Sequence, residues 1–366
     1  MTKCSYAVAL LVVMVVMAAC APASAPSSAS AAATPTPGPT IVLEAGKPPR
    51  YTGPKTTMKV VVQGRPDQAP FELAFRRGYF DSLGITVDPI TIPTGAEALQ
   101  AIATNQVQAG PTSPSAALFN ALNRGVDLRI VADQAHIEGA TDTTVSILVR
   151  SALQGQVKSM ADLKGKKFAI GGAPGSIGDL IAAKAAAKDG IKLSDMTVNY
   201  LPLGDILGAL ASGAVDAGML VEPLVGAAVG QKIAFVLYPG GQLIDGTHVA
   251  VIVYSPQFAA QTEVATRFMI GYLLGVRDFD DAFFQNKGKT EAIDLLVQYL
   301  ALKDKNVWAN ARQPKGDLNG KVNVPDLKAQ ADFFASLKLI EGAVPDVTKY
   351  VDTRFTEGAL KIIGSR

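Results

Sequence analysis

The tetrapeptide Val107-Gln108-Ala109-Gly110 returns later in the chain as Val215-Asp216-Ala217-Gly218. The two copies close a longer correspondence, in which the stretch 58–110 recurs in weakened form and constant register at 166–218. Such a unit exceeds the roughly 20 to 50 residues of a solenoid repeat. The duplication therefore predicts two similar α/β lobes, and two lobes imply a cleft between them.

Composition is that of a globular protein with a sizeable core. The chain has 366 residues, of which 48% are hydrophobic and 18% charged, enough for two domains of about 100 to 200 residues each. Basic and acidic residues number 34 and 32. This balance argues against nucleic acid as a partner, because nucleic-acid binding needs an excess of basic side chains.

The N-terminus has the layout of a secretory signal, with Lys3 ahead of a short apolar run. Its end, Val16-Met17-Ala18-Ala19-Cys20, resembles the lipobox of bacterial lipoproteins, although most lipoboxes carry Leu where Met17 stands. We expect residues 1–19 to be a lipoprotein signal peptide and Cys20 to be the site of lipid attachment. The alternative is a free secreted protein cut near Ala19.

The mature chain would keep only one cysteine, since Cys4 would leave with the signal. An exported protein with a single thiol is better explained by lipidation than by a disulfide. Residues 20–56 are mostly Ala, Pro, Ser and Thr, a composition typical of an extended tether. The predicted location is the cell membrane, with a lipid-anchored body facing the outside or the periplasm.

From Met58 onward, short β-rich runs alternate with helical patterns, which favours parallel sheets flanked by helices. Two strand-like runs, Thr144–Arg150 and His248–Tyr254, bracket the second repeat and are interpreted as hinge crossovers. The predicted first lobe comprises 57–150 and 246–366 with its C-terminal helices, and the predicted second lobe comprises 151–245.

Ligands of open α/β sheets bind beyond the carboxyl ends of the strands, where loops lead into helix N-termini. In Gly171-Gly172-Ala173-Pro174-Gly175-Ser176 the adjacent glycines would allow close approach to a ligand, although a turn with a helix cap is the alternative. We expect the ligand contacts to come from Asp67, Gln68, Phe71, Thr94, Gly95, Thr112, Ser113, Asp133, Asp142, Gly172, Pro174, Gly175, Ser176, Glu222 and His248.

Motifs for catalysis and metal binding are missing. Gly288-Lys289-Thr290 imitates the end of a P-loop, but Phe283 stands where that motif needs glycine. The only histidines, His136 and His248, have no cysteine partner in the mature body, so the usual zinc sites and Cys-His pairs cannot form. The sequence predicts neither a metal nor a cofactor.

Four motifs resemble the binding-protein family of nitrate, sulfonate, taurine and thiamine-precursor importers. They are Gly78-Tyr79-Phe80, Thr94-Gly95-Ala96-Glu97-Ala98-Leu99, Ser159-Met160-Ala161-Asp162-Leu163-Lys164-Gly165-Lys166-Lys167 and Ser212-Gly213-Ala214-Val215-Asp216-Ala217. The resemblance implies a two-lobed type II periplasmic-binding fold with two hinge crossovers. It also implies delivery of a small molecule to an ABC permease and its ATPase.

The charges in the loops at the carboxyl ends of the strands indicate what kind of ligand could bind there. These loops hold several carboxylates, and Arg65 is nearly the sole cation, which favours a neutral ligand rich in donors. Phe71, Phe119 and Tyr238 could stack on a flat ring, or could be ordinary core. Within the family, the chain looks most like a riboflavin-binding protein of a vitamin importer, so riboflavin is the expected ligand.

The alternatives are a thiamine-precursor pyrimidine or an anion of the sulfonate or nitrate type. A sensory receptor domain and a pyrimidine-synthesis enzyme share the fold, but the fungal enzymes that resemble it depend on histidine- and cysteine-rich segments absent here. We therefore expect a binding protein and not an enzyme.

Overall fold

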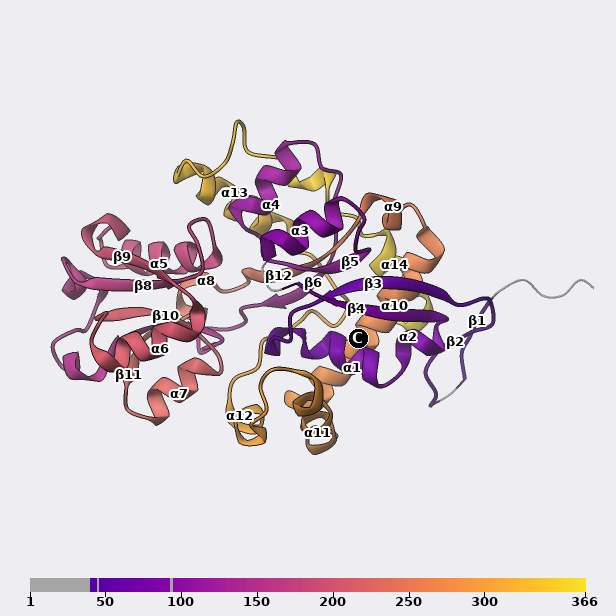
Figure 1. The fold of residues 1–366 in the computed structure, drawn as a ribbon, viewed down its shortest axis with the longest axis horizontal. Helices are drawn as coiled ribbons and strands as arrows, with labels where there is room; N and C mark the ends of the chain where they lie inside the picture. Colours follow the sequence, from indigo (N-terminus) through magenta and orange to yellow (C-terminus); the bar gives the residue numbers. More distant parts are fainter. Residues whose placement is uncertain (1–39, 45, 93–94) are drawn as a thin grey trace, which may run out of the picture. The chain divides into compact units, whose positions relative to one another are not determined.

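The computed structural model describes residues 40–44, 46–92 and 95–366. The predicted signal peptide, Cys20, the tether up to residue 39 and Thr94 lie outside these residues. The elements of two lobes are labelled in Figure 1.

The first lobe is built on a five-stranded sheet with the order β4-β3-β5-β12-β6. Its strands are β3 (Thr56–Val62), β4 (Ile85–Thr91), β5 (Ala109–Thr112), β6 (Arg129–His136) and β12 (His248–Tyr254). Strand β3 runs parallel to β4 and β5, whereas β12 pairs antiparallel with both β5 and β6.

The second lobe repeats this topology with the order β11-β7-β10-β8-β9. Its strands are β7 (Val145–Arg150), β8 (Lys167–Gly171), β9 (Thr197–Leu201), β10 (Ala217–Val221) and β11 (Ala234–Pro239). Strand β8 is parallel to β9 and β10, and β7 is the antiparallel member. Mostly parallel sheets in two similar lobes confirm the predicted α/β fold class.

The first boundary between the lobes differs from the predicted one at Arg150. Strand β7 pairs with β10 and β11, so Val145–Arg150 belongs to the second sheet. An apolar run indicates a strand but carries no information about which sheet the strand will join. The chain then returns to the first sheet with β12.

The segment from Thr40 to Thr56 also differs from the expected tether. Strand β1 (Ile41–Val42) pairs antiparallel with β2 (Arg50–Tyr51). The Tyr51 ring lies 3.8 Å from the guanidinium carbon of Arg267, and the Ser82 hydroxyl donates to the carbonyl of Pro49. These contacts attach the segment to the first lobe.

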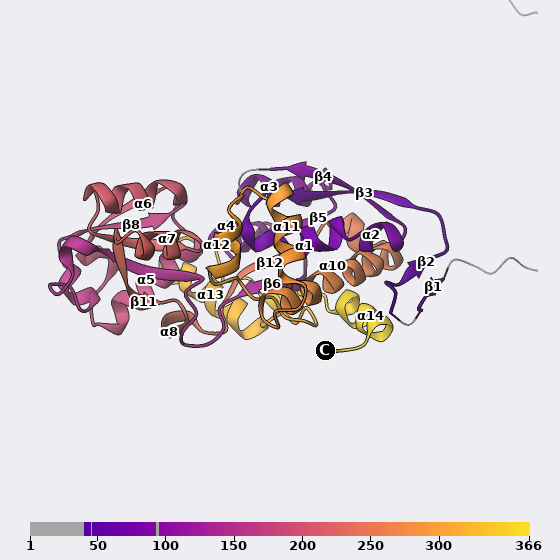
Figure 2. The same cartoon turned by 90° about the horizontal axis from the view of Figure 1, so that it is seen from below.

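Helices cover both faces of each sheet. They are α1 (Ala69–Arg76), α2 (Tyr79–Ser82), α3 (Gly95–Ala103), α4 (Ala116–Asn123), α5 (Ile177–Lys188), α6 (Leu203–Ser212), α7 (Leu224–Gly230), α8 (Gly241–Ile244), α9 (Pro256–Ala259), α10 (Thr262–Phe283), α11 (Lys289–Tyr299), α12 (Lys305–Asn310), α13 (Val324–Ser336) and α14 (Arg354–Ile363). In the second lobe, α5 packs on one face of the sheet and α6 and α7 on the other, as Figures 1 and 2 show.

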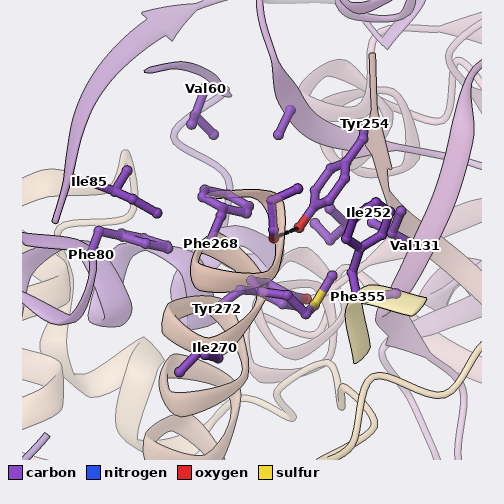
Figure 3. Close-up of a cluster of buried hydrophobic side chains, with 14 of the residues drawn as sticks. Val60, Phe80, Ile85, Val131, Ile252, Tyr254, Phe268, Ile270, Tyr272 and Phe355 are labelled. Carbon is purple, nitrogen blue, oxygen red and sulfur yellow. Dashed lines mark hydrogen bonds between the residues drawn. The ribbon is translucent and has the colours of Figure 1, made fainter. Parts of the chain in front are cut away.

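The main core of the first lobe is an aromatic cluster between the sheet and α10 (Figure 3). Phe80 and Phe268 stack with their centroids 4.9 Å apart, and the Tyr254 hydroxyl donates to the carbonyl of Ala265. Phe71 belongs to this cluster, 5.4 Å from Phe80. Burial of these rings supplies the hydrophobic stabilisation that holds the C-terminal helices to the lobe.

Two adjacent segments connect the lobes, one from β6 to β7 and one entering β12. The N–H of Ile137 donates to the carbonyl of Thr247, and the N–H of Gly246 donates to the carbonyl of Ile137. The buried carboxylate of Asp142 accepts the N–H groups of Glu138 and Thr144. The crossing segments are thus bonded to each other and fixed locally.

Candidate functional site

The carboxyl ends of the parallel strands in both sheets lead into loops that meet between the lobes. One contact is direct, because the N–H at the start of α4 (Ala116) donates to the carbonyl of Gly175 at 3.0 Å. Gly175 has φ +86°, and a Cβ there would lie 2.8 Å from the Cβ of Ala116. Only glycine suits this close approach.

Elsewhere the lobes leave a pocket of about 420 Å³, which we call the interlobe pocket. This volume suits a small molecule. Its lining comes from the second lobe and from the C-terminal segment of the first: Thr143, Glu222, Phe283, Phe284, Lys289, Ala309, Asn310, Ala311, Arg312 and Gln313.

Helix α12 positions the first-lobe wall of this pocket. Asp304 caps the helix by accepting the N–H groups of Asn306 and Val307. The fully buried Trp308 donates its indole N–H to the carbonyl of Leu302, and the Gln313 amide donates to the carbonyl of Trp308. The cap and this anchor fix the turn that carries Arg312.

Arg312 is the principal cation of the pocket. Its Nη2 lies 3.8 Å from Oδ2 of Asp142, and its guanidinium carbon lies 5.7 Å from the ring centroid of Phe284. The Nε atom is buried and has no hydrogen-bond partner among the residues that the structure describes. The side chain as a whole is 36% exposed, and a planar guanidinium that lines the pocket suits the oxygens of a carboxylate, sulfonate or nitrate.

Lys289 adds a second positive charge at the start of α11. Its Nζ donates to the carbonyl of Ala309 at 2.8 Å and lies 5.9 Å from the Phe283 ring. This contact ties α11 to α12 and leaves ammonium protons that can face the pocket.

Glu222 occupies the opposite wall, between β10 and α7. Its Oε1 accepts the Thr143 hydroxyl at 3.2 Å, and its Oε2 accepts the N–H of Gly226 at 3.0 Å. Burial raises the pKa of this carboxyl and the charge of Asp142 adds to the rise, whereas the two hydrogen bonds oppose it. The net pKa lies above the ordinary value for glutamate.

The residues predicted to contact ligand in the loop 171–176 differ in how far they are exposed. Gly172 and Pro174 are exposed, whereas Gly175 is buried against α4. Ser176 begins α5 in a capping box, in which Oδ2 of Asp179 accepts the N–H groups of Gly175 and Ser176. The capping box also engages the backbone N–H of Asp179, the third residue of α5.

In the first lobe, Asp67, Gln68 and Phe71 line a narrow hollow instead of the interlobe pocket. Asp67 pairs with Arg65 at 2.6 Å, and Oε1 of Gln68 accepts the N–H of Gln63. Phe71 packs in the aromatic core, so its expected stacking on a ligand is replaced by contacts within the lobe.

Gly95 opens α3 with free space around it, and Thr112 is buried at the end of β5. The Thr112 hydroxyl donates to the carbonyl of Ser113, which follows the strand. These three residues are among those at the carboxyl edge of the first sheet, where the sequence places them. None of the three lines the interlobe pocket.

Asp133 and His248 form a buried structural cluster where ligand contacts were expected. The Asp133 carboxylate accepts Nδ1–H of His136 at 2.7 Å, Nδ1–H of His248 at 2.8 Å and the N–H of Asp317 at 2.8 Å. Nε2 of His248 accepts the N–H of Asn323. These polar groups satisfy each other across β6 and β12, and a ligand contact of Asp133 or His248 stays a prediction.

The cluster also shifts two pKa values. Burial alone would raise the pKa of Asp133, but the hydrogen bonds and charges of the two histidines outweigh it and lower that pKa. Burial alone would lower the pKa of His136, but the hydrogen bond and charge of Asp133 raise it.

Sequence reasoning found Glu222 in the interlobe pocket and Asp142 beside it, but missed Arg312, Lys289 and Thr143. Arg65 is nearly the sole cation of the loops named from the sequence, but Arg312 and Lys289, which line the pocket, lie outside those loops. Both follow the second lobe by many residues, in a stretch interpreted as helices packed on the first lobe.

None of the helices in the described part of the chain combines the length and apolar character needed to span a bilayer. Within the same residues, no three histidine, cysteine, aspartate or glutamate side chains gather in a way that could hold a metal ion.

The chain belongs to the NMT1/THI5-like family, whose model matches residues 65–278. A candidate binding protein of Brucella abortus (strain 2308) is 24% identical over 299 residues, covering 78% of this chain and 86% of the relative.

Solved structures share the fold. The alkanesulfonate-binding protein SsuA of Xanthomonas axonopodis pv. citri, bound to MOPS, is 21% identical with a TM-score of 0.64, covering 81% of this chain and 99% of that one. The periplasmic nitrate-binding protein NrtA of Synechocystis PCC 6803 is 14% identical with a TM-score of 0.65, covering 84% and 89%. These likenesses establish the two-lobed fold of periplasmic binding proteins.

Proposed function

We propose that this protein is the extracytoplasmic solute-binding component of an ABC importer, and that its ligand is a small oxyanion of the sulfonate or nitrate type. The observation that carries the proposal is Arg312, whose partly exposed guanidinium lines the interlobe pocket. The alkanesulfonate- and nitrate-binding proteins of the same fold support this ligand class.

Riboflavin, the expected ligand, receives less support from the pocket. Phe71 and Phe119 are buried in the cores of the first lobe, and the Tyr238 hydroxyl donates to Asp189 in the second. The three rings expected to stack on a flat heterocycle therefore serve the fold. We therefore propose the sulfonate- or nitrate-type anion, which the sequence offered as an alternative, in place of riboflavin.

Ligand binding would favour a closed arrangement of the two lobes. An anion held by Arg312 on one wall and by donors on the other, such as the Thr143 hydroxyl, favours the conformation in which both walls touch it. That conformation would then be recognised by a permease and its ATPase. Lipid attachment through Cys20 would keep the protein beside these partners.

Replacement of Arg312 tests the ligand class. Arg312→Ala is expected to weaken binding of ethanesulfonate or nitrate by roughly 10- to 100-fold, because a charge-assisted hydrogen bond contributes about 1.5–3 kcal/mol. Calorimetric titration measures the affinity, and small-angle scattering of the same samples measures closure. Arg124→Ala, which breaks an exposed ion pair with Glu341, is the matched control.

Riboflavin and a thiamine-type pyrimidine are titrated in parallel. Tight binding of either, with no binding of nitrate or any sulfonate, contradicts the proposal. Equal affinity of the Arg312→Ala and unchanged proteins for the anion also contradicts it.

A further inference from the structure

The two lobes are joined by a backbone hydrogen bond that lies outside the interlobe pocket. The N–H of Ala116, at the start of α4 in the first lobe, donates to the carbonyl of Gly175 in the second lobe at 3.0 Å. Neither residue lines the interlobe pocket. This contact can therefore influence how the lobes are arranged without touching a ligand held there.

The second-lobe side of this contact is fixed by a buried carboxylate. Oδ2 of Asp179 accepts the N–H of Gly175 at 2.8 Å and the N–H of Ser176 at 3.1 Å, while its Oδ1 accepts the Tyr200 hydroxyl. Asp179 itself is only 2% exposed. The carbonyl of Gly175 is thus presented to the first lobe by a loop that is already ordered, which lowers the entropy lost when the contact forms.

The first-lobe side uses a donor that a helix cannot satisfy by itself, because the first N–H groups of an α-helix have no partner within it. Within α4, Ser115 accepts the N–H of Leu118 with its hydroxyl and the N–H of Phe119 with its carbonyl. The N–H of Ala116 is bonded instead to the other lobe. If the lobes part, only water can replace that partner.

Apolar side chains from the segment of α13 surround the contact. Phe333 packs against the cores of both lobes. Leu339 follows this helix, and its carbonyl accepts the Asn120 amide of α4 at 2.9 Å. A Cβ at Gly175 would lie 3.7 Å from Cδ1 of Leu339. These groups limit the access of water, and a hydrogen bond is stronger in such surroundings than in water.

We infer that Ala116 and Gly175 form a closure latch, an interlobe hydrogen bond that favours the closed arrangement before ligand arrives and thereby raises ligand affinity. The effect on affinity rests on the proposed function, whereas the effect on closure does not. The apparent affinity of a protein that binds only when closed is reduced by the fraction that is open. A single hydrogen bond shifts such an equilibrium by only a few-fold, so the latch still allows the lobes to open for release.

Two substitutions break the latch from opposite lobes. Gly175→Ala places a Cβ 2.8 Å from the Cβ of Ala116, too close for the lobes to keep this contact. Ala116→Pro removes the donor, at a helix start where proline is tolerated. Each is expected to weaken ethanesulfonate binding about threefold or more in calorimetric titration. Because both break the same contact, the double variant should bind no more weakly than the weaker single variant.

Gly190→Ala is the matched control. Gly190 follows the other end of α5, has φ +72° and has open space where a Cβ would stand. The substitution therefore carries the same left-handed backbone strain without an interlobe contact. It should keep the ethanesulfonate affinity of the unchanged protein.

Closure is measured without ligand, so that the latch is tested apart from the ligand class. Small-angle scattering should give a larger radius of gyration for both latch variants than for the unchanged protein and Gly190→Ala. Amide hydrogen exchange at Ala116 should quicken about threefold or more in Gly175→Ala. Thermal melting establishes that each variant is folded.

Unchanged scattering and exchange in the latch variants overturn the inference, as does an equal loss of affinity in Gly190→Ala. Opening of the lobes with unchanged ethanesulfonate affinity overturns the effect of the latch on binding. If neither ethanesulfonate nor nitrate binds to the unchanged protein, the proposed function fails, whereas scattering and exchange without ligand still decide whether the latch holds the lobes closed.

Discussion

At the residue scale, Asp133 shows how one buried carboxylate joins three parts of the chain. It accepts from His136 on its own strand, from His248 on β12 and from the N–H of Asp317 in the segment after α12. Its backbone carbonyl accepts the Tyr272 hydroxyl of α10. The side chain thereby fixes the place where both connecting segments leave the first lobe.

Asp133→Asn is expected to lower the free energy of unfolding by about 3–5 kcal/mol, because it removes the buried charge that pairs with the histidines. Asp127→Asn, in an exposed pair with Arg129, is the control and should change stability by at most about 1 kcal/mol. Denaturant unfolding at pH 6 measures both. Equal stability of the two variants would contradict the assigned role.

The same cluster predicts a pH dependence. The raised pKa of His136 means that its stabilisation is complete below about pH 6.5 and is lost as pH rises through the folded-state pKa. The lowered pKa of Asp133 means that its stabilisation is present above about pH 4 and is lost as pH falls through the folded-state pKa. Asp133→Asn should flatten the melting temperature on the alkaline side.

At the element scale, α10 approaches the helices beside it through glycine. A Cβ at Gly275 would lie 2.2 Å from the carbonyl oxygen of Pro70 in α1, and a Cβ at Gly271 would lie 2.7 Å from the Phe80 ring. Glycine within a helix lowers intrinsic helix stability by about 1 kcal/mol relative to alanine. Packing outweighs this loss.

Gly275→Ala is therefore expected to destabilise the fold by about 1–3 kcal/mol through overpacking, despite the better helix propensity of alanine. Gly208, in α6, has open space around it, so Gly208→Ala should stabilise by up to about 1 kcal/mol. Chemical denaturation of the two variants compares them directly. Effects of the same sign would refute the packing argument.

The secondary-structure elements were easier to predict from the sequence than the sheets that their strands join. The repeat led to two lobes, and the lobes have equivalent strand orders. The apolar run of β7 was identified as a strand, yet its sheet was assigned wrongly, because pairing depends on contacts distant in sequence. Arg312 was missed for a similar reason, since the short helix α12 and its turn have no repeated counterpart to draw attention to them.

The polar residues that the sequence placed at strand ends have different surroundings in the structure. Glu222 lies in the interlobe pocket, whereas Asp133 and His248 bond to each other. From the sequence, a carboxylate at the end of a strand looks the same whether it faces a ligand or a neighbouring strand. Only the register of β6 against β12 decides between these two uses.

At the scale of the whole molecule, location is open to a direct test. Cys20→Ser is expected to release the protein from the membrane fraction into the soluble extracytoplasmic fraction and to abolish incorporation of labelled palmitate, because a thiol is needed for acylation. Cys4→Ser is the matched control and should remain membrane-bound. A Cys20→Ser protein that keeps its label would contradict lipid attachment at this residue.

The position of β12 between β5 and β6 has a consequence for biosynthesis. Every strand of the second sheet has been translated by Pro239, whereas the first sheet waits for His248–Tyr254. The lobe whose translation starts first is therefore completed last, contrary to the usual N-terminal-first order. Until then β5 and β6 each present an unpaired edge, so nascent chains halted before His248 are the forms most exposed to aggregation and proteolytic quality control.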